Sequence, residues 1–316
     1  MLNSLSQNIF LFFLKLNLKR KSIYNFKDLN FKQHDFINYK IVKQLAIKEN
    51  FINDTKNIET HTFSFLFFFQ KLGGKKSIDL SKKNIFLWFK KFKFYKKFPW
   101  SDDFSAKRLI NIIYSYDFIC SISDTKEIET LEYIINFHIK RFVFDINRKK
   151  DSGVTSYEVL ALVLIGCIQQ GFNKKILQII NSFVEKNIDD ISMHKSYNIL
   201  EHAKVLNNFN EIKNILLFYK IEIPKVLNQQ ILGMTSLLSR YRHHDYSLPL
   251  FNNCNNNHNT TIQKIIDKEQ SLKSRSTSNL INGIAIYRDT KKTLFFDVVQ
   301  PTKFNFSKEL SAGSLA

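Results

Sequence analysis

The sequence is short of glycine, proline and cysteine: its 316 residues include 8 Gly, 4 Pro and 3 Cys. So few glycines leave little material for tight phosphate-binding loops, and there is no glycine-rich phosphate loop, nucleophile elbow or kinase signature. Cys120, Cys167 and Cys254 are an odd number without a short spacing, which argues against a disulfide scaffold and is typical of a reduced, non-secretory protein. We therefore predict no catalytic residue and no cofactor, and we expect a protein that is not an enzyme.

A zinc site is not predicted either. His243, His244, Cys254 and His258 are residue types that bind zinc, but their spacing matches no familiar finger and the loop between them is rich in asparagine. Solvent-facing or RNA-facing histidines are the favoured interpretation.

Long apolar stretches are also missing. The longest, Val159 to Ile168, is half of the roughly 20 residues that a membrane-spanning helix needs. Residues 1–27 contain no acid, and Lys15 interrupts their apolar stretch Ile9 to Leu14, a pattern closer to a mitochondrial transit peptide than to a signal peptide. The alternative is an ordinary basic amphipathic helix. From the transit-peptide interpretation we predict the mitochondrial matrix as the location.

What the sequence has in excess is positive charge, with a formal net charge of +19. Residues 1–100 hold 20 Lys and Arg against 6 Asp and Glu, a net charge of +14, whereas residues 101–316 carry +5. A bias in codon usage alone would spread the excess evenly, so the asymmetry is more informative than the total. Such a charge indicates a polyanionic partner, for example nucleic acid or an anionic membrane surface.

The segment 75–100 is the most unusual, because lysines alternate there with aromatic residues. Lysine can neutralise phosphates, while tryptophan and phenylalanine can stack on unpaired bases. For the aromatic residues we favour the alternative of an amphipathic helix with the rings packed inward and the lysines in solvent. Adsorption to an anionic membrane is a third interpretation. The predicted RNA-binding residues are Lys82, Lys83, Trp88, Lys90, Lys91, Lys93, Lys96 and Lys97, with a second group of Arg240, Arg242, His243 and His244.

Apolar residues recur at helical spacing from residue 101 onward. The helices predicted at 156–170 and 174–186 align with those predicted at 192–207 and 211–220 at an offset of 36 residues, which is typical of helical repeats. A plain helical bundle is the alternative. The fold class predicted is mainly α, with helix–turn–helix repeats as a short α-solenoid or bundle, an extended basic N-terminal region and a small C-terminal β-hairpin. Further helices are predicted before Pro99 and at residues 36–51, 109–116, 127–144, 224–246 and 262–272. Residues 63–72 are predicted to be a helix or a strand. The two strands of the hairpin are predicted at 280–287 and 293–299.

The domains predicted are a targeting segment at 1–27, a basic aromatic-rich region at 28–100, a helical-repeat domain at 101–224, and at 225–316 a helix, an Asn-rich loop and a β-hairpin tail.

The segments Ser156–Phe172 and Ser192–Phe209, with Ser105–Phe118, resemble the heptatricopeptide-type RNA-binding proteins of apicomplexan mitochondria. The chain departs from that family because it lacks a recognisable RAP domain at its C-terminus.

The resemblance implies binding to organellar RNA. The leading hypothesis is a structural RNA-binding component of a mitochondrial ribonucleoprotein, with the mitoribosome as the first choice. Its partners would be rRNA or other mitochondrial RNA and neighbouring proteins of a large assembly, with no small-molecule substrate and with membrane contact as the weaker option. The alternatives are an accessory structural subunit of a mitochondrial inner-membrane complex and a free RNA-processing factor.

Overall fold

The computed structural model describes residues 57–94, 98–149, 153–169, 174–243, 245, 247–250, 254, 259–267, 278–281, 283–289 and 292–298. The targeting segment predicted at 1–27 and the helix predicted at 36–51 lie outside these residues. The chain divides into two compact units, Met1–Ile176 and Leu177–Ala316, and each is considered by itself. The domain boundaries expected from the sequence at residues 100 and 224 stay predictions.

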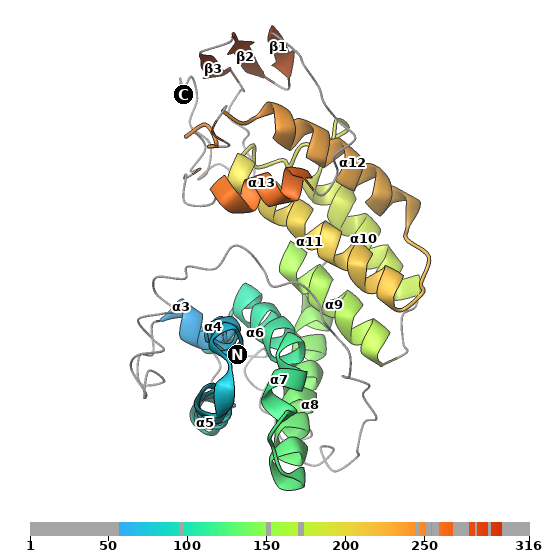
Figure 1. The fold of residues 1–316 in the computed structure, drawn as a ribbon. Coiled ribbons are helices and arrows are strands. Elements are labelled where there is room, and N and C mark those ends of the chain that lie inside the picture. The colour runs from blue at the N-terminus through green and yellow to red at the C-terminus, as the bar shows by residue number, and fades with distance from the viewer. Residues whose placement is uncertain are drawn as a thin grey trace. The chain divides into compact units, whose positions relative to one another are not determined.

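The first unit is helical, which confirms the fold class for this part of the chain (Figure 1). The segment expected before Pro99 to be a short helix is 19 residues long, and residues 65–72 are helical rather than a strand. The elements are α3 (Ile58–Thr62), α4 (Phe65–Leu72), α5 (Gly74–Phe92), the 3₁₀ turn η2 (Phe98–Trp100), α6 (Asp102–Tyr114), α7 (Tyr116–Cys120), α8 (Thr125–Arg148) and α9 (Ser156–Ile168), followed by α10 (Lys174–Asn187), which contains the boundary between the units.

Local signals set the ends of these helices. Gly73 ends α4 with a φ of 65°, a left-handed conformation that costs glycine nothing. Capping boxes start α8 at Asp124 and α9 at Thr155, and in each the third residue, Glu127 or Glu158, completes the box. The helix predicted at 156–170 thus begins at the residue expected from the sequence, with Thr155 as its N-cap.

The core of the first unit lies between α5, α6 and α8 and is mostly aromatic. Trp88 and Phe92 of α5 are fully buried, and the Trp88 ring lies beside Phe63 and near His138 of α8. Helix α9 packs on α6 and is buried along its whole length, which suits its nearly uninterrupted apolar sequence.

The second unit is built around α11 (Ile199–Phe218), on which α12 (Lys225–Arg240) and α13 (Asn259–Asp267) pack. The 36-residue register predicted two helices at 192–207 and 211–220, but α11 is continuous, so this helix–turn–helix repeat is absent and that prediction was wrong. Asn207, Asn208 and Asn210, where the two predicted helices would have been separated, are buried inside α11, where packing outweighs a propensity difference of about 0.7 kcal/mol or less per residue. The N-cap of α11 is Asn198, so the helix begins later than the predicted start at residue 192, where Ser192 has a φ of 69°.

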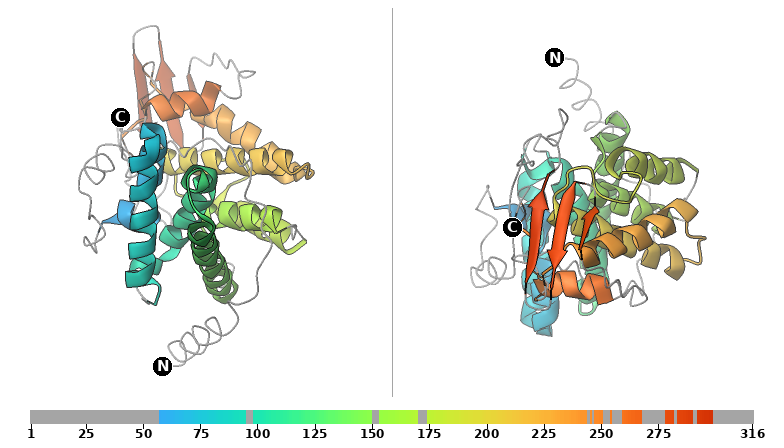
Figure 2. Two further views of the ribbon diagram at one scale, coloured as in Figure 1. Left: turned by 60° about the horizontal axis from the view of Figure 1, so that its bottom comes forward. Right: turned by 90° about the horizontal axis from the view of Figure 1, so that it is seen from above.

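A small antiparallel sheet with the order β1-β2-β3 follows α13 in the chain (Figure 2). The strands are β1 (Ser278–Ile281), β2 (Ile284–Arg288) and β3 (Thr293–Asp297). The predicted hairpin is confirmed as β2 and β3, in which Ile286 pairs with Phe295. The run expected as one strand at 280–287 instead contains a turn at Gly283, with a φ of 72°, and so contributes to two strands.

Candidate functional site

Helix α5 has one buried and one cationic face. Its buried face carries Trp88, Phe89 and Phe92 together with Ile78 and Ile85. Lys76, Lys83 and Lys90 recur every seven residues, which places them on one stripe of the helix about 10 Å apart along its axis. We call the exposed lysines of this helix the α5 lysine face: Lys75, Lys76, Lys83, Lys90 and Lys91.

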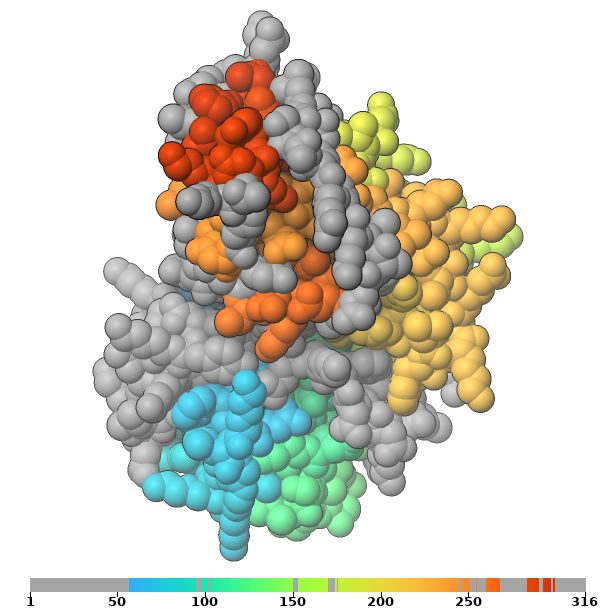
Figure 3. Space-filling view, turned by 45° about the horizontal axis from the view of Figure 1, so that its top comes forward, coloured from blue at the N-terminus to red at the C-terminus, as the bar shows by residue number. Residues whose placement is uncertain are grey.

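The α5 lysine face carries little negative charge of its own. Asp79 is the acidic residue of α5, and its Oδ1 lies 3.5 Å from Lys82 Nζ. Leu87, at 38% exposure, lies among the lysines. In the space-filling view the light-blue side chains of this part of the chain stand out at the molecular surface (Figure 3). A run of exposed cations with one neutralised acid can attract an extended anion.

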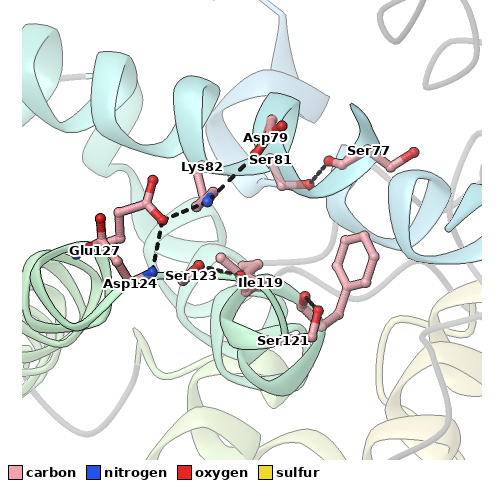
Figure 4. Close-up of polar contacts among 10 residues, drawn as sticks. Ser77, Asp79, Ser81, Lys82, Ile119, Ser121, Ser123, Asp124 and Glu127 are labelled. Carbon is pink, nitrogen blue, oxygen red and sulfur yellow. Dashed lines mark hydrogen bonds and ion pairs between the residues drawn. The ribbon is translucent and has the colours of Figure 1, made fainter. Parts of the chain in front are cut away.

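Lys82 was predicted to bind RNA, but the structure places it in a structural ion pair. It is buried, and its Nζ donates to Glu127 Oε2 at 2.7 Å (Figure 4). The same carboxylate oxygen accepts from the backbone N of Asp124 at the start of α8. Lys82 therefore links α5 to the first turn of α8 and is not part of the α5 lysine face.

Trp88 was among the predicted RNA-binding residues, and the structure places it in the core. Its side chain has no exposed surface, and its indole Nε1 donates to His61 Nδ1 at 3.0 Å. The favoured alternative, with the rings packed inward, describes Trp88, Phe89, Phe92 and Trp100, whereas Phe94 and Phe98 are exposed. A ring inside the core can stack on a base only if the unit opens, because its faces already contact Phe92 and Trp100.

The remaining predicted lysines divide into two groups. Lys83, Lys90 and Lys91 are exposed, as an ionic contact requires. Lys93 is half-buried, with its Nζ 5.3 Å from the ring centre of Phe89 and 5.1 Å from that of Phe94. Lys96 and Lys97 lie outside the described residues.

The second predicted group lies at the end of α12, where the sheet meets it. Arg288 of β2 donates from Nη2 to the carbonyl oxygens of Arg240 at 3.0 Å and Arg242 at 2.6 Å, and the His243 ring lies 5.0 Å from that of Phe295. Burial, together with Arg242, lowers the pKa of Arg288. His244 lies outside the described residues. Sequence reasoning missed Arg288, because its contacts are 46 and 48 residues away in the chain.

A second feature that the sequence did not reveal is a group of cations inside the first unit. Arg108 is fully buried, with its Cζ 4.1 Å from the ring centre of Trp88 and 4.4 Å from that of Trp100. Arg141 lies 3.7 Å from the Trp100 ring centre, and His138 stacks near the same ring at 5.0 Å. We call Arg108, His138 and Arg141 the buried cation cluster.

Burial makes a charge in this cluster costly. It lowers the pKa of Arg108 well below its usual value, and the neighbouring Arg141 lowers it further. Burial, then Arg108 and Arg141, also hold the pKa of His138 well below 6.5, so His138 is neutral at pH 7. Arg141, whose pKa burial lowers to about 10, has Asp145 as an ion-pair partner at 3.8 Å.

The second unit brings together a serine and two histidines. His194 Nδ1 lies 2.7 Å from Ser196 Oγ, and His202 Nε2 lies 2.9 Å from the carbonyl oxygen of Met234. A histidine beside a hydroxyl is the arrangement that activates a nucleophile. These side chains are at most 5% exposed, however, so a dissolved substrate does not reach them in this fold.

Among the residues that the structure describes, no three His, Cys, Asp or Glu side chains gather in a way that could hold a metal ion. His244 and His258 of the considered zinc group lie outside that part. No helix within the described ranges combines the length and apolar character needed to cross a bilayer.

No protein-family model and no curated protein sequence matches this chain. Solved structures with a similar fold include heparan sulfate lyase HepC from Pedobacter heparinus, with a TM-score of 0.58 at 12% identity over 97% of this chain and 58% of the lyase. Heparinase III is similar with a TM-score of 0.60 at 13% identity over 92% of this chain and 49% of that enzyme. The chain thus spans about half the length of these proteins, and the likeness concerns the fold.

These neighbours contradict the function predicted from the sequence. The prediction was a structural RNA-binding component of a mitochondrial ribonucleoprotein, with an inner-membrane accessory subunit as the alternative. The fold instead resembles that of heparan sulfate lyases. The error arose because a basic, helical sequence is compatible with many anionic partners, and its composition does not distinguish among them.

Proposed function

We propose that this chain binds a sulfated polysaccharide through the α5 lysine face. The observation that carries the proposal is the row of exposed lysines on one helix, with Lys76, Lys83 and Lys90 repeating at about 10 Å. A linear sulfated polymer lying along the helix would meet one ammonium group after another. Lysine suits such a ligand because its mobile ammonium acts as a point charge without a fixed hydrogen-bonding geometry.

The choice of polysaccharide rather than RNA rests on the aromatic residues. Recognition of single-stranded RNA uses exposed rings on which bases stack. Trp88, Phe89 and Phe92 of α5 are buried, and the apolar residue among the exposed lysines of this helix is Leu87. Phe94 and Phe98, which are 39% and 41% exposed, follow the helix and are not part of the α5 lysine face. The fold neighbours, whose names identify heparan sulfate as their substrate, support the same class of ligand.

We propose binding rather than cleavage as the activity of this surface. The neighbours are lyases, but a chain 12–13% identical to them shares their fold and not thereby their reaction. Helix α5 contains no histidine or tyrosine that could take a proton from a sugar ring, and its acidic residue Asp79 is paired with Lys82. The prediction that the protein is not an enzyme is kept as part of this proposal.

The experiment compares two triple variants on immobilised heparin. Lys76→Gln, Lys83→Gln and Lys90→Gln together remove the central stripe of the α5 lysine face. The matched control removes the same charge from exposed lysines of the second unit: Lys186→Gln, Lys220→Gln and Lys225→Gln. We expect the first variant to bind heparin about tenfold or more weakly at 0.1 M salt, because it loses the row of cations that would meet the polymer. We expect the control to change by less than about twofold, because its three lysines do not form a row on one helix.

Three outcomes would contradict the proposal. Equal losses in both triple variants would mean that net charge, and not the α5 lysine face, drives binding. Tighter binding to single-stranded RNA than to heparin of equal charge would identify the wrong class of polymer. Ultraviolet absorbance of unsaturated uronate, appearing on incubation with heparan sulfate, would reveal a lyase.

A further inference from the structure

The buried cation cluster contains hydrogen-bond donors that the described part of the chain does not satisfy. Arg108 Nη1 donates to the carbonyl oxygens of His61 at 2.6 Å and Pro99 at 2.8 Å, which uses both of its hydrogens. Arg108 Nε and Nη2 are buried and have no hydrogen-bond partner among the described residues. Both ring nitrogens of His138 are buried without a partner there as well.

The unused donors of Arg108 form a specific shape. Nε–H and one Nη2–H point in parallel from the same edge of the guanidinium, and this edge matches the two oxygens of a carboxylate-like anion. The guanidinium lies over the rings of Trp88 and Trp100, with its Cζ at 4.1 and 4.4 Å from their centres. Nη1 therefore binds backbone carbonyls, and the Nε/Nη2 edge, which we call the fork, has no hydrogen-bond partner among the described residues.

The charges of the cluster indicate the charge of an anion that would bind at the Nε/Nη2 edge of Arg108. Arg141 has Asp145 at 3.8 Å, and its Nη1 donates to the carbonyl oxygen of Lys93 at 2.7 Å. Arg108 has no ion-pair partner among the described residues, which leaves one uncompensated positive charge in a low-dielectric environment. A single negative charge would neutralise it, whereas a divalent anion would leave an excess of the opposite sign.

We infer that the first unit holds a binding site for a small planar monovalent oxyanion, of the carboxylate class, at the Nε/Nη2 edge of Arg108, with His138 as a further donor. This site is separate from the α5 lysine face and does not depend on the polysaccharide proposal. The anion would be held by two parallel N–H groups of Arg108, and its burial would strengthen those bonds relative to the same bonds in water.

Formate is the probe, and the two tryptophans report on the site. Trp88 and Trp100 are the only tryptophans of the sequence, and both contact the cluster, so thermal unfolding followed by tryptophan fluorescence measures this core. The full chain is unfolded in sodium formate and in sodium chloride at equal ionic strength. We expect formate to raise the midpoint by about 5 °C in a saturable manner when it is present at about a hundred times its dissociation constant.

Two variants locate the effect. Arg108→Lys keeps the charge but removes the fork, and we expect it to lose the difference between formate and chloride. The triple variant Lys76→Gln, Lys83→Gln, Lys90→Gln should keep that difference, which separates this site from the polysaccharide surface. If Arg108→Lys does not fold, titration of the unaltered chain with ¹³C-formate by NMR still tests the proposal, with one saturable site expected.

The result that would overturn the inference comes from the unaltered chain. Equal midpoints in formate and chloride, together with no stoichiometric formate binding, would mean that the fork is closed by the rings or by a carboxylate of the chain itself. A formate effect that persists in Arg108→Lys would place the bound anion elsewhere.

Discussion

The cores of the two units both bury groups that can carry a proton, but they accommodate them differently. The first unit buries Arg108 and Arg141, whose guanidinium groups lie against tryptophan rings and donate to backbone carbonyls. The second buries His194 and His202, whose pKa values are lowered by burial and whose hydrogen-bond partners lie in the loop before α11 and in α12. A core can therefore hold a cation when aromatic faces and carbonyls surround it, whereas it holds histidine by removing the charge.

The largest effect is expected when an aromatic ring that lies against the buried arginines of the first unit is removed. Trp88→Ala deletes a fully buried ring that touches Arg108, so it should lower the free energy of unfolding of the first unit by about 4 kcal/mol. Chemical denaturation followed through the remaining Trp100 measures this loss. Trp88→Phe is the control, because it keeps a ring and loses the hydrogen bond to His61. A loss below about 1 kcal/mol in Trp88→Ala would show that the ring does not support the buried cation.

Acidification tests how the buried histidines of the second unit affect its stability. Burial lowers the pKa of His194 and of His202 to about 4, from 6.5, so both stay neutral in the folded chain while the unfolded chain takes up protons below pH 6.5. Their contribution to the free energy of unfolding is therefore complete above pH 6.5 and falls as the pH decreases toward 4. Between pH 7 and 5 the loss should be about 2 kcal/mol for each histidine.

Hydrogen exchange of α11 and α12 at several pH values measures this loss in the second unit. His202→Gln, which lacks the titrating ring, should reduce the pH dependence by the share of one histidine. If the dependence were unchanged in this variant, other groups would be responsible for the acid sensitivity.

A smaller effect is expected where α12 meets the loop before α11. Gly233 lies in a helix, where alanine is ordinarily about 1 kcal/mol better, but a Cβ there would lie 2.6 Å from Ser192 Cβ. We expect Gly233→Ala to lower the free energy of unfolding of the second unit by about 2 kcal/mol. Ser192→Gly removes the clash and suits the φ of 69° at that position, so the double variant should be at least as stable as the original chain. Denaturation curves of the original chain, the two single variants and the double variant measure these differences. A double variant that is as unstable as Gly233→Ala alone would refute the explanation.

The smallest effect concerns the N-cap of α9. Thr155 Oγ1 accepts from Glu158 N at 3.3 Å, and Glu158 Oε2 accepts from Thr155 N at 2.9 Å. Thr155→Ala should lower the free energy of unfolding of the first unit by about 1 kcal/mol. Ser156→Ala is the matched control with a smaller expected loss, and thermal unfolding compares the two. A larger loss at Ser156 would show that Ser156, and not Thr155, is the residue that caps the helix.

Much of the helical content could be predicted, because the periodicity of apolar residues is a local property. The helix predicted at 127–144 lies within α8, where Leu131, Ile134, Ile135 and His138, at helical spacing, are buried. The continuity of α11 could not be foreseen, since its central asparagines are weak helix formers that only tertiary packing keeps in a helix. The turn at Gly283 could have been found, because Asn282-Gly283 is a common hairpin dipeptide.

Some features of the candidate sites also follow from the sequence pattern, whereas others depend on the tertiary structure. The amphipathic pattern by itself determined that α5 would have lysines on one face and rings on the other, because both residue types recur in the sequence at the helical spacing of 3.6 residues. The tertiary structure alone decided that Lys82 pairs with Glu127 and that Arg108 lies beside Trp88 and Trp100. The partners in the first pair are 45 residues apart in the chain. Such pairs depend on which helices meet, and that is set by the packing of the whole unit rather than by any local pattern.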